Sequence, residues 1–267
     1  MSLASSLSFA GAVTVAASPA AVLLATTVLH RPELVILAIG SACVWLLAIT
    51  LCAVFWWATA AVGTVARLVL VVGCGVAVQE GARWLTYVLY LRLLNGLRSV
   101  GLQQQGGITS ALHTSAPAAV ANGVGIGLVQ MLVMYGDVAA RALLPGGLYT
   151  EACHGLSLFA VDALCALGML LLNVLLSLLG WTAAYPRRSR KLAGALVGLH
   201  LLASAATLLN SPQVSPANGC AVALPCLFAS VAAAALLTVY TISTSMADFA
   251  IARPAQHPAP HEHMRSG

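Results

Sequence analysis

The amino-acid sequence predicts an all-α, polytopic membrane protein folded as a bundle of seven transmembrane helices. Of its 267 residues, 60% are hydrophobic and only 7% are charged, and its mean hydropathy is +0.95. A soluble domain has about a quarter of its residues charged. The apolar residues also gather in runs of about 20 or more, the length at which a helix crosses a bilayer. Short connections separate these runs, so the chain has no room for a sizeable soluble domain.

The first apolar run, residues 7–27, has no basic residue before it, and the first charge of the chain is Arg31. A cleaved signal peptide has the reverse pattern, with a basic segment first. We therefore expect a true first helix, kinked at Pro19, which membrane helices tolerate. We also expect one long, mobile polar connection over residues 92–117. The expected membrane domain covers residues 1–247, with spans over 7–27, 34–57, 66–91, 118–144, 156–184, 192–209 and 221–244, and a disordered tail over 248–267.

Basic residues divide unequally between the two sides that seven spans define. With an exoplasmic N-terminus, exoplasmic segments hold only Arg67 and Arg141. Such an asymmetry marks the cytosolic side of a membrane protein, so we expect an exoplasmic N-terminus and a cytosolic C-terminus. The net charge of +5 is thus a topology signal, and the expected surroundings are membrane lipids rather than nucleic acid. The basic residues of the expected cytosolic segments are Arg31, Arg92, Arg98, Arg187, Arg188, Arg190, Lys191, Arg253 and Arg265.

Charged and polar residues interrupt the third run, Leu70–Leu91, at Gln79, Glu80 and Arg83. An ionised group at the centre of a spanning helix costs roughly 2.5–3.5 kcal/mol on insertion scales. Glu80 and Arg83 are three residues apart and can pair on one helix face. Two interpretations remain open: a self-neutralised pair with Arg83 reaching toward water, or a buried polar network. The other members of an intramembrane polar core would be Asn173 and His200, in the fifth and sixth runs.

Small residues mark the fourth run, where Gly123 and Gly127 form a GxxxG pattern with Gly125 between them. Glycines four residues apart form a groove that lets another helix approach closely. We therefore predict a helix-packing role for Gly123 and Gly127.

Cysteines in expected exoplasmic segments predict one disulfide. Cys153 and Cys220 lie on the same side, in a compartment where disulfides persist. We expect them to be bridged, with Cys226 as the alternative partner.

Catalytic patterns are weak in this sequence. Asp137 and Asp162 lie in the fourth and fifth runs, and two membrane aspartates could act as a protease pair. Asp137 also has Arg141 one turn later, the spacing of an ordinary ion pair, which we favour. The sequence has no GxSxG or HExxH pattern and no Cys/His spacing typical of a metal site. We predict no catalytic, cofactor-binding or metal-binding residues, and only a solvated role for the histidines of the tail, His257, His261 and His263.

Several segments together resemble the anterior-pharynx-defective subunit family of γ-secretase. The matching pieces are the segment Pro19–Gly40, Gln79-Glu80-x-x-Arg83, Gly123-x-x-x-Gly127, Ala142–Gly146 and the segment Leu196–Asn210. Their order within seven spans carries the likeness, which runs from Phe9 to Thr244. Two positions depart from the family pattern: Met131 stands where a third glycine is usual, and Asn173 where a histidine is usual.

The resemblance implies a non-catalytic scaffold subunit of an intramembrane aspartyl protease. Its expected partners are a presenilin-like catalytic subunit, a nicastrin-like subunit and a small presenilin-enhancer subunit. The complex would process single-span membrane proteins and so take part in Notch signalling. It would lie in the endoplasmic reticulum, Golgi, endosome or plasma membrane. The alternative is a small transporter or channel that uses Glu80, Arg83 and His200 as a polar path.

Overall fold

The computed structural model describes residues 3–99, 109–142, 153, 155–210, 214 and 219–251, and seven long helices account for nearly all of these. Each is long and apolar enough to cross a membrane, and the described residues include no strand. The predicted all-α fold with seven spans is therefore confirmed. The helices are α1 (Leu3–Leu23), α2 (Pro32–Ala58), α3 (Thr64–Ser99), α4 (Thr109–Ala142), α5 (Leu158–Leu179), α6 (Arg190–Thr207) and α7 (Cys220–Ile251). Three short helical segments extend them: η1 (Leu24–Val28) after α1, η2 (Gly180–Ala184) after α5 and η3 (Leu208–Asn210) after α6.

Local signals explain where several helices begin. Pro32 opens α2 at a position where its missing N–H is not needed. The Ser157 side chain accepts a hydrogen bond from the Ala160 N–H and caps α5, and Ser189 caps α6 in the same way through Leu192. Serine at this position satisfies one of the free N–H groups of the first turn.

The polar connection expected over residues 92–117 is shorter than predicted. The third helix continues to Ser99, and the fourth begins at Thr109. Leucine and arginine after residue 91 are good helix formers, and Gly96 alone is too weak a breaker to end the helix. The expected tail also begins late, because α7 continues to Ile251; residues 252–267 lie outside the described residues.

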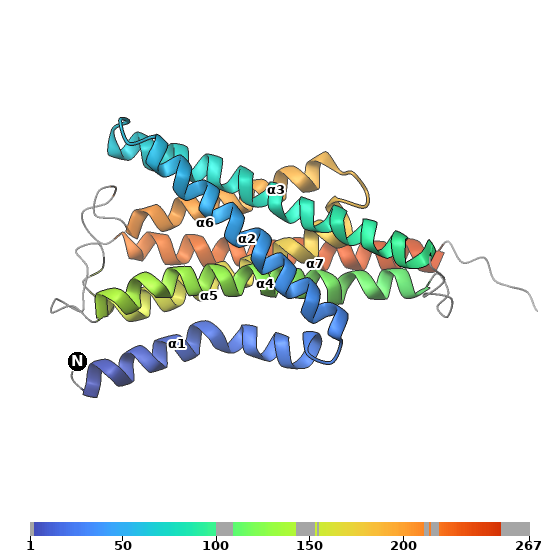
Figure 1. Cartoon of the computed structure of the whole chain (residues 1–267), viewed down its shortest axis with the longest axis horizontal. Coiled ribbons are helices and arrows are strands. Elements are labelled where there is room, and N and C mark those ends of the chain that lie inside the picture. The colour runs from blue at the N-terminus through green and yellow to red at the C-terminus, as the bar shows by residue number, and fades with distance from the viewer. Residues whose placement is uncertain are drawn as a thin grey trace, which may run out of the picture.

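The bundle is centred on α4 and α5, which pack against each other along their length (Figure 1). In the spanning segments of α4 and α5, 67% and 72% of the residues are buried. In the other five spanning segments, at most 28% are buried. The first helix lies along one side of this central pair, and α2 crosses α4. Many large apolar side chains of the outer helices are exposed, which suits helices that contact lipid.

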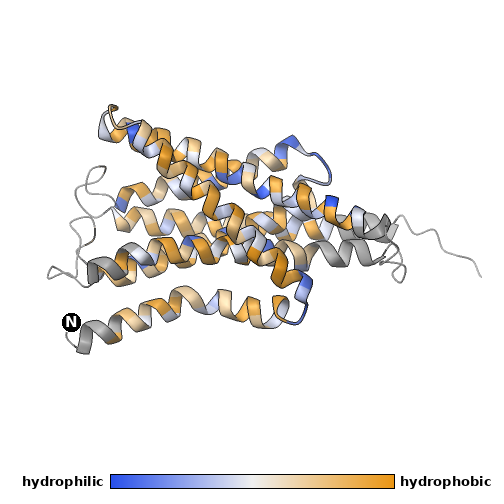
Figure 2. Cartoon of the chain, viewed as in Figure 1, coloured by the Kyte–Doolittle hydropathy of each residue, from blue (hydrophilic) through white to orange (hydrophobic). Residues whose placement is uncertain are grey.

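Hydrophilic residues gather where the chain leaves the spans. The α1–α2 turn and the α5–α6 connection are hydrophilic (Figure 2) and lie at the same end of the bundle. The α2–α3 turn lies at the opposite end (Figure 1). Consecutive helices therefore alternate in direction, as a chain that crosses a membrane repeatedly requires.

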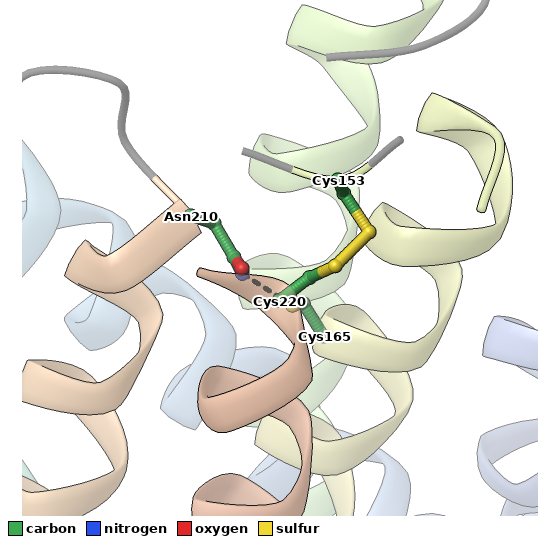
Figure 3. Close-up of a disulfide and its surroundings, with 4 residues drawn as sticks. All are labelled: Cys153, Cys165, Asn210 and Cys220. Atoms are coloured by element: carbon green, nitrogen blue, oxygen red, sulfur yellow. Dashed lines mark hydrogen bonds between the residues drawn. A yellow bond between two sulfur atoms is a disulfide. The ribbon is translucent and has the colours of Figure 1, made fainter. Parts of the chain in front are cut away.

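A disulfide links Cys153, in the segment before α5, to Cys220 at the start of α7 (Figure 3). The two Cα atoms are 5.5 Å apart, within the usual range for a bridged pair. The predicted pairing is confirmed, and the alternative partner Cys226 is a free cysteine. Beside the bridge, the Asn210 amide donates to Cys165 Sγ at 3.3 Å (Figure 3), so the ends of α5, η3 and α7 are held together.

Cys220→Ser should lower the thermal stability of the protein. The bridge closes a loop with a sequence separation of 67 residues, which in a soluble chain corresponds to about 4 kcal/mol of unfolded-state entropy. We expect a smaller loss here, because inserted helices already restrict the unfolded chain. Thermal unfolding in detergent with and without reductant measures the effect. Cys226→Ser is the matched control, and an equal loss of stability for that variant would contradict the assignment.

Candidate functional site: a polar cluster inside the helix bundle

A charged pair lies in the middle of α3. Arg83 Nε donates to Glu80 Oε2 at 3.1 Å, and Nη2 donates to Oε1 at 3.3 Å. Arg83 is 0% exposed and Glu80 only 7% exposed. The opposite charges compensate each other where solvent cannot. The interpretation in which Arg83 reaches toward water is wrong, because its side chain is directed into the protein instead.

The fifth helix binds the remaining donors of Arg83. Nη1 donates to the Asn173 main-chain carbonyl at 3.0 Å and to Ser177 Oγ at 2.7 Å, and Nη2 donates to Asn173 Oδ1 at 2.8 Å. A backbone carbonyl inside an α-helix already accepts its helical hydrogen bond, so the Asn173 carbonyl accepts from Arg83 through its second lone pair. Asn173 and Ser177 provide these acceptors from one face of α5, being four residues apart. A guanidinium group with its fixed fork of donors is thereby held between two helices.

The sixth helix completes the carboxylate side of the pair through His200. Its Nδ1 lies 2.5 Å from Glu80 Oε1, and its ring stacks on Trp45 of α2 with 6.4 Å between centroids and 12° between planes. Arg83 and His200 thus both contact the Glu80 carboxylate, the first from α3 and the second from α6. His200 Nε2 is buried and has no hydrogen-bond partner among the described residues.

A second group of polar residues continues the network toward α2 and α4. Asn122 donates from Nδ2 to Ser177 Oγ at 2.9 Å. Its Oδ1 accepts from Ser41 Oγ at 2.8 Å and from Thr86 Oγ1 at 2.9 Å. All four side chains are buried. The amide oxygen and amino group of Asn122 are therefore both used, and no lipid-exposed partner is needed.

The connected cluster joins five helices through hydrogen bonds and one stacking contact. Each interhelical hydrogen bond in a membrane is worth only about 0.6 kcal/mol on average. The cluster therefore acts mainly by selecting one rotation and depth for each helix. Its members are Ser41 and Trp45 of α2, Glu80, Arg83 and Thr86 of α3, Asn122 of α4, Asn173 and Ser177 of α5, and His200 of α6.

Gln79 points away from the predicted polar core. It lines a neighbouring cavity of about 330 Å³, together with Gln130, Ser204 and other residues of α2 to α6. One step along α3 rotates the Gln79 side chain by about 100° from that of Glu80, and Gln79 faces this neighbouring cavity instead. Gln130 connects the two regions, because its Oε1 accepts a hydrogen bond from Trp45 Nε1 at 3.0 Å.

Tyr185 covers the cluster where η2 ends. The centroids of the Tyr185 and Tyr87 rings are 5.3 Å apart. A Cβ added to Gly180 would lie 2.9 Å from the Tyr185 ring. Burial raises the pKa of the Tyr185 phenol, so the group remains a neutral hydroxyl at physiological pH. Tyr185 lies beside Glu80 in the lining of one cavity, so an aromatic ring adjoins the charged pair on this side.

The glycines of α4 are the points of closest helix approach. A Cβ added to Gly123 would lie 2.6 Å from Val174 Cα, on α5. At Gly127 it would lie 3.1 Å from Leu170 Cγ, also on α5. Gly125 faces the other way, and an added Cβ would collide with the main-chain oxygen of Ala38 on α2. The GxxxG pair therefore contacts α5, while the glycine between its members contacts α2.

The two departures from the family pattern both lie at helix contacts. Met131 is 7% exposed and packs in an apolar cluster with Phe159 and Leu170 of α5. A flexible methionine fills an irregular gap well, so α4 stays packed on α5 beyond its glycines. Asn173 contributes the two oxygens that bind Arg83, an acceptor role that suits an amide.

The hydroxyl and amide groups that extend the cluster are not among the residues predicted from the sequence. Ser177 could have been found, because it follows Asn173 by four residues and so shares its face. Asn122 directly precedes Gly123 in an otherwise apolar run, which was also a usable signal. Ser41, Thr86 and Trp45 carry no such signal, since serine, threonine and tryptophan are common in spanning helices.

The predicted Asp137–Arg141 ion pair lies outside the described residues, because neither side chain is among them. Asp162 is half-buried on α5. Within the described ranges, no three His, Cys, Asp or Glu side chains gather as metal ligands. The histidines at 257, 261 and 263 also lie outside the described residues.

Comparison with known protein families agrees with this architecture. The family model described as "Aph-1 protein" matches residues 7–242, a range that contains α2 to α6 whole, every residue of the polar cluster and the glycines of α4. Aph-1 is the anterior-pharynx-defective subunit of γ-secretase, a multi-pass membrane protein distinct from the catalytic presenilin. The chain belongs to the Aph-1 family of γ-secretase subunits.

Proposed function

We propose that this chain is a non-catalytic scaffold that assembles a γ-secretase-like protease. The observation that carries the proposal is the buried cluster around Arg83, which commits its polar groups to one another across five helices. Such a cluster favours a single, rigid arrangement of helices, and a rigid membrane surface suits the docking of other spanning subunits. Family membership supports a place in that complex.

The proposed partners are a presenilin-like catalytic subunit, a nicastrin-like subunit and a small presenilin-enhancer subunit. The complex would cleave single-span membrane proteins, Notch-type receptors among them. Its compartments would be the endoplasmic reticulum, Golgi, endosomes and plasma membrane, because membrane proteins of this class mature along that route.

Affinity purification in mild detergent tests the scaffold role. We expect recovery of the presenilin-like and nicastrin-like chains with the wild-type protein, and a loss of protease activity when this subunit is depleted. Recovery of the chain without either partner from a cell that contains both would contradict the proposal. Activity restored by re-expression serves as the control for depletion.

A polar path for solutes or protons is the second candidate, because cavities lie on both sides of the polar cluster. Gln79 lines the cavity of about 330 Å³ described above. Glu80 lines another cavity, of about 350 Å³, between α3 and α6. Purified protein in liposomes gives the decisive measurement. Proton or solute flux that disappears in Glu80→Gln would support a transport function, whereas a scaffold predicts no flux above that of empty liposomes.

The proposed orientation has an exoplasmic N-terminus and a cytosolic C-terminus. The α1–α2 turn, which contains Arg31, and the α5–α6 connection, with Arg187 and Arg188, lie at one end of the bundle (Figure 1). Arg67, next to the α2–α3 turn, belongs to the other end, where its guanidinium stacks over the Trp56 ring at 3.7 Å. The basic end should face the cytosol.

A glycosylation tag inserted within residues 146–155 should be modified, and a reporter fused after Arg265 should be cytosolic. Protease protection of sealed vesicles provides the matching measurement for the second site. Modification at the C-terminal site, or its absence at the inserted tag in a folded protein, would contradict this orientation.

A further inference from the structure

A second cavity opens between α3 and α6, beneath the α5–α6 connection. Its volume is about 350 Å³, at the lower end of the range for small-molecule pockets. Glu80 closes its inner end, so the proposed scaffold role leaves the rest of the cavity without an assigned use. Its lining residues are Glu80 and Trp84 of α3, Ala184, Tyr185, Arg188 and Ser189 around the connection, and Arg190, Ala193, Leu196 and Val197 of α6.

The mouth of this cavity is basic. Arg188 and Arg190 both line it and both are exposed. The single acidic residue of the lining, Glu80, is compensated by Arg83 at 3.1 Å, so it does not cancel the arginines. Arg188 has a φ of 48°, a left-handed conformation that is uncommon for a residue with a side chain. The backbone thus adopts a costly conformation at a residue that lines the cavity.

Backbone groups add to the attraction for an anion. The first turn of α6 begins at Arg190; Ser189 accepts from the Leu192 N–H through its side chain and from the Ala193 N–H through its carbonyl. The other N–H groups of a first helical turn lack partners within the helix and carry partial positive charge. They lie beside the two arginines at the mouth of the cavity.

The wall of the cavity is apolar and continues into the lipid-facing surface. Trp84 is 54% exposed and Val197 is 40% exposed, and both belong to spanning helices. Leu196 and Ala193 continue the same wall on α6. An apolar wall open to the membrane, below a basic rim at the end of the spans, matches the division of a phospholipid into acyl chain and phosphate.

We propose that this cavity binds an anionic phospholipid from the surrounding leaflet. The phosphate-bearing headgroup lies at Arg188 and Arg190, and the upper part of one acyl chain lies along Trp84, Leu196 and Val197. The volume is too small for a whole lipid, so the rest of the chains stay in the bilayer. Basic side chains near a membrane surface favour anionic lipid by a factor of about five each, from about 1 kcal/mol at 1.4 kcal/mol per tenfold.

Quenching of Trp84 fluorescence by brominated lipids tests the proposal. The full chain is reconstituted into phosphatidylcholine vesicles that contain increasing amounts of brominated phosphatidylserine or brominated phosphatidylcholine. The Trp84 signal is the difference between the wild-type protein and Trp84→Phe. We expect half-maximal quenching at a content of brominated phosphatidylserine at least about fivefold lower than that of brominated phosphatidylcholine.

Charge variants identify the site. Arg188→Gln with Arg190→Gln should bring the ratio between the two lipids close to one, while Lys191→Gln should preserve it. Lys191 belongs to the same basic segment and is exposed, but it does not line the cavity. Equal quenching by both lipids in the wild-type protein, or the same loss of preference in Lys191→Gln, would overturn the proposal.

Two further measurements need no variant. Salt should weaken the preference, because screening acts on exposed charges. Inorganic phosphate or soluble glycerophosphoserine should not displace the lipid at matched ionic strength, since neither has an acyl chain for the apolar wall. Displacement by phosphate alone would show a simple anion site and overturn the lipid as occupant.

Discussion

Arg83→Met should be among the most damaging single substitutions in the polar cluster. Methionine is similar in length and apolar, so the change removes the charge and five hydrogen bonds with little loss of volume. It leaves Glu80 as a buried carboxylate with only His200 beside it, and Asn173 and Ser177 lose their donor. Breaking a buried pair from one side costs about 3–5 kcal/mol in soluble proteins.

The reverse change, Glu80→Met, should cost less than Arg83→Met but more than His200→Ala. Arg83 keeps Asn173 and Ser177 on α5 as acceptors, so the stranded charge is better solvated by the protein. The double variant with both methionines should be milder than Arg83→Met alone, since neither charge is then left unpaired.

A double-mutant cycle on thermal unfolding in detergent measures this coupling. Arg92→Met is the matched control, because Arg92 is exposed on the same helix, and it should unfold close to the wild-type temperature. If the double variant is instead as unstable as the sum of the single ones, the two charges do not neutralise each other, and Arg83 depends mainly on α5.

The fold could be predicted from sequence because the bilayer imposes strict rules on length and polarity. Seven apolar runs gave seven spans, since no irregular chain can face lipid. Helix ends were less predictable: nothing in the residues after Leu91 stops α3 in water, so it continues to Ser99. Membrane thickness sets the minimum length of a span, whereas propensity decides how far the helix continues beyond it.

Which polar residues meet depends on helix rotation, and only part of that rotation is encoded locally. Glu80 and Arg83 could be paired from their spacing alone. That His200 should bind Glu80, or that Asn122 should bind Ser177, depends on how α4, α5 and α6 turn toward each other. The orientation of Gln79 also follows from rotation. Although it directly precedes Glu80 on α3, its side chain lines another cavity.

That rotation is fixed at the glycines of α4. Asn122 reaches Ser177 only because Gly123, the next residue, lets α4 come within contact of the α5 backbone. The polar cluster and the glycine contacts are therefore coupled: a change that separates α4 from α5 also breaks the Asn122 hydrogen bonds. A substitution at Gly123 should consequently disturb groups that it does not touch.

Gly123→Ala should destabilise the protein by about 1–3 kcal/mol or more, the range of overpacked cores. Its new Cβ would lie 2.6 Å from Val174 Cα, and a backbone atom cannot rotate away. Gly125→Ala meets the Ala38 backbone and should be as severe. Gly127→Ala meets the Leu170 side chain at 3.1 Å and its backbone at 3.3 Å, and these longer distances should make it milder.

Gly136→Ala is the matched control on the same helix, because an added Cβ there meets nothing within 4 Å. Alanine favours helix over glycine by about 1 kcal/mol, so this variant should be neutral or slightly more stable. Thermal unfolding gives the order of the four variants, and co-purification of the partner subunits shows whether assembly follows it. Because propensity acts equally at all four positions, any difference between them reports helix contact alone. Equal stability of Gly123→Ala and Gly136→Ala would mean that α4 and α5 can separate without cost, and the polar cluster would then have to set their spacing unaided.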